Sequence, residues 1–148
     1  MTQRTRHALL TNAQKAEVDR LTIAYGMSAN ALTKNPGCAV ADAILQRWPM
    51  RRAIVLCGPG GNGGEGFVVA QRLAAADWPV CVATLASTDR LRGAAAYHAA
   101  LWREPIKAMT PDCLEGAELV VDAIFGSGLS RPLERRVDRT QGVSALKP

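Results

Sequence analysis

The sequence predicts an α/β domain built on a mostly parallel sheet, with right-handed crossovers and helices on both faces. Three short apolar runs, at residues 53–57, 80–85 and 119–125, have the length and continuous apolar character of buried strands. The first and the third end at a glycine, and stretches with helical spacing of apolar residues separate the runs. Alternation of strand and helix is the pattern that parallel sheets produce.

Size and composition favour a single compact domain. The chain has 148 residues, of which 48% are hydrophobic, and no apolar stretch approaches the length of a membrane span. The four cysteines form no C-x-x-C pair, which argues against a structural metal and fits a reducing compartment, so we expect a cytoplasmic protein. The formal net charge is +5, but its basic residues do not alternate with aromatic ones. An anionic small ligand is therefore favoured over nucleic acid.

Two helices are expected before the first strand. Thr11 or Asn12 can cap the first of them, and Gly26 is its natural stop. The second should begin a few residues later, but Pro36 fits the first turn of a helix better than its interior. We therefore predict that residues 27–37 form a helix end, a loop and a restart.

The rest of the chain continues the alternation. A glycine-rich loop is predicted at residues 58–66, an alanine-rich helix at about 88–102 and a short strand at 106–109. The last residues are polar and show neither an apolar helical stripe nor an apolar strand. We therefore expect the domain to occupy residues 1–133 and residues 134–148 to form a flexible tail.

The first candidate site is the stretch GPGGNGGEG, residues 58–66, placed between a strand and a helix. Glycine tolerates tight turns and lets backbone N–H groups approach a phosphate. Gly58, Gly60 and Gly63 satisfy the G-x-G-x-x-G spacing of dinucleotide-binding loops. The alternative is a glycine-rich turn that binds no ligand. No acidic residue closes the second strand to hold a ribose, as the usual dinucleotide-binding fold requires.

Asn62 and Glu65 are the long polar side chains of this loop. The amide oxygen of Asn62 suits a cation or a ligand hydroxyl, and the alternative is that Asn62 merely occupies a left-handed turn position. Glu65 should lie in the first turn of the following helix, where the helix dipole favours a carboxylate whatever its function.

The second candidate site is LVVDAIFGSGLSRP, residues 119–132. Asp122 interrupts an apolar strand, and a carboxylate buried there requires a cation or several hydrogen-bond donors. Because parallel strands present their carboxyl ends at one edge, we expect Asp122 to face Asn62 across a shared crevice. The alternative is a carboxylate satisfied by backbone N–H groups at a turn. Arg131 either pairs with a phosphate or is solvated, and a second anion-binding loop could comprise Gly126, Ser127, Gly128 and Ser130.

Two long motifs, in this order, resemble the NAD(P)H-hydrate epimerase family, the YjeF N-terminal domain. The family's VLCGPGNNGGDGF and VVDAxFG(T/S)GLxRP read VLCGPGGNGGEGF at residues 55–67 and VVDAIFGSGLSRP at residues 120–132. The segments LTNAQKAEVDRL, residues 10–21, and NPGCAVAD, residues 35–42, are also similar to the family's pattern. This chain departs from the family's asparagine, aspartate, glutamate and alanine at Gly61, Glu65, Lys34 and Pro36, respectively.

The resemblance implies a three-layer α/β/α Rossmann-like sandwich, a bound potassium ion and frequently a homodimer. Members interconvert the R and S forms of hydrated NADH and NADPH, so that an ADP- or ATP-dependent dehydratase specific for the S form can restore the coenzyme. Carried over by position, Asn62 and Asp122 would ligate potassium, and Asp122 would act beside the reacting ring as the catalytic residue. The implied substrate-binding residues are Gly61, Asn62, Gly63, Gly64, Glu65, Gly126, Ser127, Gly128, Leu129, Ser130, Arg131 and Pro132.

The family's pattern continues through another helix into a D-x-P-S-G segment, whose aspartate binds substrate and whose serine helps to ligate potassium. This sequence ends before that segment, so we expect it to correspond to the N-terminal portion of the family's domain. The resemblance predicts an isomerase that acts on hydrated NADH and NADPH. The alternative is a non-catalytic dinucleotide-binding module of the same fold.

Overall fold

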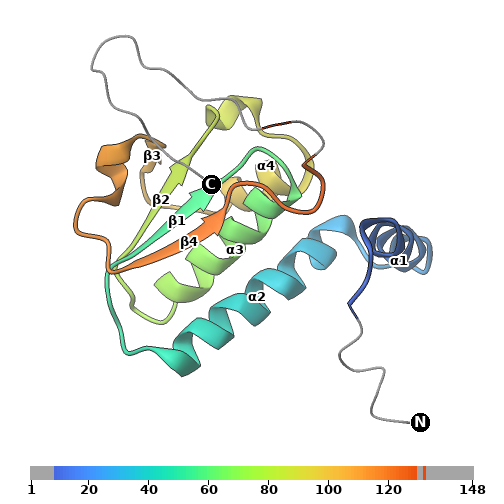
Figure 1. Ribbon diagram of the computed structural model, residues 1–148, viewed down its shortest axis with the longest axis horizontal. Coiled ribbons are helices and arrows are strands. Elements are labelled where there is room, and N and C mark those ends of the chain that lie inside the picture. Colours follow the sequence, from blue (N-terminus) through green and yellow to red (C-terminus); the bar gives the residue numbers. More distant parts are fainter. Residues whose placement is uncertain (1–8, 130–131, 133–148) are drawn as a thin grey trace.

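The computed structural model describes residues 9–129 and Pro132 of the chain (Figure 1). The predicted tail at residues 134–148 lies outside the described residues, as do Ser130 and Arg131 of the second motif. In chain order the elements are α1 (Asn12–Ala24), α2 (Ala29–Arg47), β1 (Ala53–Cys57), α3 (Gly61–Ala74), β2 (Val80–Thr84), the 3-10 helix η2 (Thr88–Arg90), α4 (Gly93–Ala100), β3 (Ile106–Ala108), the 3-10 helix η3 (Pro111–Leu114) and β4 (Leu119–Ala123).

The four strands form one sheet in the order β3-β2-β1-β4, and every neighbouring pair is parallel. The predicted α/β fold with a parallel sheet is therefore confirmed. In the register of β1 with β4, Leu56 lies opposite Asp122 and Cys57 opposite Ala123, so the two candidate motifs leave the sheet side by side. None of the helices described between residues 9 and 129 combines the length and apolarity that a bilayer crossing needs.

The two faces of the sheet are covered unequally. Helices α2, α3 and α4 pack on one face, and α2 and α3 run side by side (Figure 1). The residues that fill this interface include Val55, Phe67, Val82 and Leu73, all fully buried. On the other face, the core beneath η3 is smaller and consists of Ile54, Leu56, Ala83 and Cys113, with partly buried neighbours.

Helix α1 begins where the sequence predicted and is stabilised by a capping box. The Thr11 hydroxyl accepts a hydrogen bond from the Gln14 N–H, and the Gln14 side chain accepts one from the Thr11 N–H. The helix ends before Gly26, which adopts a φ of +100°. No residue of α1 is buried, and the helix lies apart from the sheet (Figure 1).

The predicted break at residues 27–37 is wrong, because α2 runs through Pro36 without interruption. Proline costs a helix one backbone hydrogen bond. Here the buried stripe of α2, Thr33, Gly37, Ala41 and Ile44, continues on both sides of the proline. A Cβ on Gly37 would lie 2.7 Å from Val68 Cβ, so α2 approaches α3 closely at this point. Packing against α3 outweighs the lost hydrogen bond.

The predicted helix at about residues 88–102 is divided into η2 and α4. Gly93, with a φ of +56°, begins α4 and explains the division, since an ordinary helix cannot pass through a left-handed residue. The predicted strand at residues 106–109 forms as β3 and is one residue shorter.

Candidate functional site

The motifs that follow β1 and β4 enclose one open hollow of about 540 Å³ at the carboxyl edge of the sheet. Ligands bind α/β sheets at this edge, because the loops that leave the strands there have free backbone groups. The start of α3 forms one wall, the segment after β4 another, and α1 adds a single side chain. The lining residues are Lys15, Pro59, Gly60, Gly61, Asn62, Glu65 and the six residues from Ile124 to Leu129.

The first motif contains less loop than predicted, because α3 begins at Gly61. Gly60 precedes the helix as its N-cap, and no side chain caps the helix there. The prediction of a loop at residues 58–66 is therefore wrong beyond Gly60. Glycine is a poor helix former, but the turn that starts α3 is fixed by tight packing against β1 and β4.

Three glycines of this motif are required by packing, whereas a Cβ on Gly64 would lie 3.1 Å from Thr33 of α2, a tight but less severe approach. A Cβ on Gly58 would overlap the carbonyl oxygen of Ile124, and one on Gly63 would overlap the carbonyl oxygen of Gly58. On Gly66 it would lie 2.7 Å from the Ala123 Cβ. These glycines let α3 lie directly against the ends of the two strands. Packing alone explains why these positions are glycine, as in the alternative of a glycine-rich turn that binds no ligand.

Gly60 and Gly61 are different, because a Cβ on either would have no neighbour within 4 Å. Both are exposed and line the hollow. The first backbone N–H groups of a helix have no partner within it, so the backbone at these positions is free to approach a bound anion. The prediction that this motif binds a ligand therefore rests on these two glycines.

Asn62 joins the two walls of the hollow. Its side chain is half-buried, and its Oδ1 lies 3.4 Å from the position of a Cβ on Gly126. A side chain at position 126 would press on Asn62, so glycine there keeps the amide beside the second motif. That motif closes with a turn in which the Leu129 N–H donates to the Gly126 carbonyl oxygen at 3.2 Å. The prediction that the two motifs share a crevice agrees with this arrangement.

Glu65 is the acidic side chain that lines the hollow within the described part of the chain. The sequence predicted Glu65 in the first turn of the helix. It is instead the fifth residue of α3, because the helix begins earlier than predicted. Burial raises the pKa of the Glu65 carboxyl above its usual value, while the positive charge of Lys15 opposes the rise and Asp19 adds to it. Glu65 is thus a half-buried carboxyl that holds a proton more readily than an exposed one.

Asp122 is not placed as predicted. Its side chain is exposed, and its Oδ1 accepts a hydrogen bond of 3.0 Å from the Ile124 N–H. Because Val121 and Ala123 face the helices, Asp122 projects from the opposite face of the sheet, and it is not among the residues that line the hollow. The predicted burial of Asp122 is wrong, and the contact with a backbone N–H, which the sequence offered as the alternative, is present.

The other predicted substrate residues fall into three groups. Gly126, Ser127, Gly128 and Leu129 line the hollow, Gly63 and Gly64 are buried beneath it, and Pro132 is exposed. Ser130 and Arg131 lie outside the described residues. Lys15 was missed, because nothing in the sequence shows that α1 reaches this edge of the sheet. Pro59, Ile124 and Phe125 were also missed, although they lie inside the motifs.

The described residues do not by themselves form a potassium site. Asn62 and Asp122 offer the hard oxygen ligands that such a cation takes. However, Asn62 lines the hollow and Asp122 does not, and one Asp122 oxygen already accepts the Ile124 N–H. Between residues 9 and 129 no three His, Cys, Asp or Glu side chains gather as metal ligands either.

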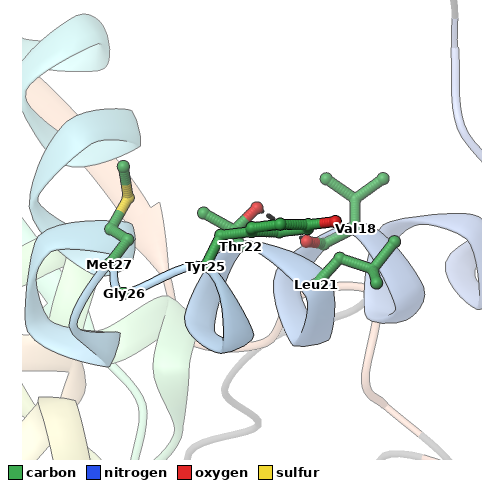
Figure 2. A pocket seen from close by; sticks show the side chains of 6 residues that line it. All are labelled: Val18, Leu21, Thr22, Tyr25, Gly26 and Met27. Carbon is green, nitrogen blue, oxygen red and sulfur yellow. Dashed lines mark hydrogen bonds between the residues drawn. The ribbon is translucent and has the colours of Figure 1, made fainter.

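A second hollow lies on α1 and the turn that follows it, and its wall is mainly apolar (Figure 2). It is lined by Val18, Leu21, Thr22, Tyr25, Gly26 and Met27. The Thr22 hydroxyl donates to the Val18 carbonyl oxygen within the helix. Among residues 9–129, no charged side chain lines this hollow.

Comparisons with known proteins agree with the fold and the motifs. A family model described as YjeF-related protein N-terminus matches residues 29–141. The chain is 40% identical over 139 residues to an NAD(P)H-hydrate epimerase of Rhodobacter capsulatus, covering 84% of this chain and 65% of that protein. It is 36% identical over 134 residues to a bifunctional NAD(P)H-hydrate repair enzyme Nnr of Coxiella burnetii, covering 88% of this chain and 28% of that protein.

A solved structure, that of the yeast protein YNL200c, matches with a TM-score of 0.74 at 22% identity, covering 86% of this chain and 60% of that one. This likeness supports the fold alone. The chain spans less than two thirds of the length of each of these relatives.

Proposed function

We propose, because this chain belongs to the family described as YjeF-related protein N-terminus, that it is an NAD(P)H-hydrate epimerase, an isomerase that interconverts the R and S forms of hydrated NADH and NADPH. The single observation that carries the proposal is that both characteristic motifs of the sequence line one hollow at the carboxyl edge of the sheet. Two relatives at 40% and 33% identity that are named NAD(P)H-hydrate epimerases support it.

In this proposal the hydrated dinucleotide lies between the two walls of the hollow. Gly61, Asn62 and Glu65 contact it from α3, and residues 126–129 contact it from the segment after β4. Gly63 and Gly64 act indirectly, since they let α3 pack closely enough to present these groups. Ser130, Arg131 and Pro132 join the binding surface on the strength of the second motif, in which an arginine can pair with phosphate.

The proposed reaction needs a carboxyl group that gives and then takes a proton. Protonation of the hydroxyl on the hydrated ring carbon lets it leave as water, and the ring nitrogen supplies the electron pair that forms an iminium. Water then adds to the other face, and the carboxylate accepts a proton from it. The second motif supports Asp122 as this group. Glu65 also qualifies, because it is a half-buried carboxyl in the wall of the hollow.

A potassium ion held by Asn62 and Asp122 is a further part of the proposal and rests on the resemblance of the two motifs. When bound, such an ion would supply positive charge that attracts and orients the oxygen atoms of the substrate. Asn62 lines the hollow and Asp122 does not, so no step of the reaction is assigned to the ion.

The proposed partner is a dehydratase that consumes the S form with ADP or ATP. The relatives named bifunctional NAD(P)H-hydrate repair enzymes support the pairing of two repair activities. A homodimer is proposed from the family resemblance. All four cysteines lie in the described residues and are free thiols, which supports work in the reducing cytoplasm.

The test is turnover of the R form of hydrated NADH by the purified chain in potassium buffer, followed by chromatography of the S form. Spontaneous interconversion sets the baseline, and Asp122→Asn and Glu65→Gln are run beside the unchanged protein. Conversion above the baseline that one of these variants loses supports the proposal. Conversion no faster than buffer, with dinucleotide binding retained, would instead identify a non-catalytic binding module.

A further inference from the structure

Lys15 is the basic side chain that lines the sheet-edge hollow within the described residues. It comes from the first turn of α1, whereas every other lining residue belongs to the two motifs. Its positive charge acts on Glu65 of α3, because it lowers the pKa of that carboxyl against the effect of burial. The hollow therefore has a positive group that neither motif supplies.

A specific contact holds α1 in this position. The Asn12 Nδ2 donates a hydrogen bond of 3.0 Å to the Ser127 carbonyl oxygen, across 115 residues of sequence. Asn12 and Lys15 are three residues apart, so they lie on the same side of α1. Within the described residues this is the one side-chain hydrogen bond that joins α1 to the rest of the molecule, and α1 buries no residue of its own. The position of Lys15 thus depends on Asn12.

Lys15 can change partners at little cost. Its Nζ lies 2.6 Å from Asp19 Oδ2, but the two side chains are 53% and 39% exposed. Exposed ion pairs of this kind are weak, because water and salt screen them. The diphosphate of a dinucleotide carries two negative charges and four terminal acceptor oxygens, against one charge and two oxygens on a carboxylate, so it competes well for the ammonium.

We propose that Lys15 is a substrate-binding residue that binds a phosphate of the hydrated dinucleotide, and that the Asn12–Ser127 hydrogen bond positions it. The proposal rests on the proposed function, which supplies the dinucleotide. Phosphates are the anionic groups of such a substrate, and the open backbone at Gly60 and Gly61 faces the same hollow. The ligand is thus held between an ammonium on α1 and the amino end of α3.

The test is equilibrium binding of NADP+ by calorimetry at low and at physiological salt. Lys15→Met keeps an unbranched side chain that is one atom shorter and removes its charge, and should weaken binding by about fivefold to tenfold at low salt, less at higher salt. Lys15→Arg should retain most of the affinity. Arg20→Met is the matched control, because Arg20 lies on the same helix, pairs with Glu17 and does not line the hollow.

Asn12→Ala should weaken binding in the same way, and adding it to Lys15→Met should cost little more, since both changes remove one interaction. Equal affinities of Lys15→Met and the unchanged protein at low salt would overturn the role of Lys15 and leave the epimerase proposal standing. An unchanged protein that binds no NADP+ at low salt would overturn the proposed function and, with it, this role.

Discussion

Gly58 at the end of β1 and Ile124 after β4 lie so close that a Cβ on the glycine would overlap the isoleucine carbonyl oxygen. The contact joins the two motifs at their bases, where the Gly58 N–H also donates to the Ala123 carbonyl oxygen at 3.0 Å. The geometry of the hollow is therefore set by backbone against backbone, which cannot yield as a flexible side chain can.

Replacement of Gly58 by alanine should accordingly lower the free energy of unfolding by about 3 kcal/mol or more, because two backbones must separate. Gly60→Ala is the matched control, since a Cβ there meets nothing within 4 Å and the φ of −102° suits any residue. It should change stability by less than about 1 kcal/mol. Urea denaturation of both variants measures the free energies of unfolding. Equal losses of stability in the two variants would contradict the packing argument.

Exchange of Glu65 for glutamine should change how stability depends on pH. The pKa of this carboxyl is raised in the folded protein, so its ionisation favours the unfolded chain. The protonated carboxyl therefore stabilises the fold fully at pH values below the pKa of Glu65 in the unfolded chain. This stabilisation is lost as the pH rises through the higher pKa of Glu65 in the folded protein. Glutamine should therefore gain stability relative to the unchanged protein between about pH 4 and 7. Denaturation midpoints at several pH values measure this, and a constant difference would contradict it.

Asp122→Asn separates a catalytic role from a structural one. Asparagine keeps an oxygen that can accept the Ile124 N–H, so stability should change by less than about 0.5 kcal/mol. Asp122→Ala loses that hydrogen bond and should cost about 1 kcal/mol. If Asp122 is the proton donor, both variants should lose hydrate turnover by about a hundredfold or more. If Glu65→Gln loses turnover while Asp122→Asn does not, the carboxyl in the hollow is the catalytic group.

Cys57 should be inert toward thiol reagents in the folded protein. Burial raises the pKa of its thiol to about 12, and only the thiolate reacts. Cys38, which is half-buried on α2, is the internal comparison. Labelling followed by peptide mass analysis should modify Cys38 first and Cys57 only when denaturant unfolds the sheet. Early modification of Cys57 would mean that the central strand opens without global unfolding.

The sheet could be predicted from sequence because its strands are short apolar runs, and buried strands need little else. The prediction of a break near Pro36 was wrong because that region depends on long-range packing. A local rule favoured a break, but contacts between Gly37 and Val68, distant in sequence, hold α2 together. Local patterns carry no information about such packing.

The site was predicted in part. The two motifs that line the hollow were visible as sequence, and their placement after adjacent strands follows from the topology. The exposure of Asp122 was not predicted, because the prediction assumed that β4 is covered on both faces, whereas Val120 on the same face is 50% exposed. The role of Lys15 could not be predicted, since its position depends on the hydrogen bond from Asn12 to Ser127, 115 residues later in the sequence.

The hydrogen bond between Asn12 and Ser127 also bears on how the molecule is made. A chain that grows from its amino end on the ribosome presents α1 first, but Ser127 follows the last strand, and β1 gains its second neighbour only when β4 has emerged. Long-range pairings of this kind form late. Lys15 of α1 can therefore join the hollow only after β4 has emerged, so a nascent chain has most of its helical layer before it can hold a ligand.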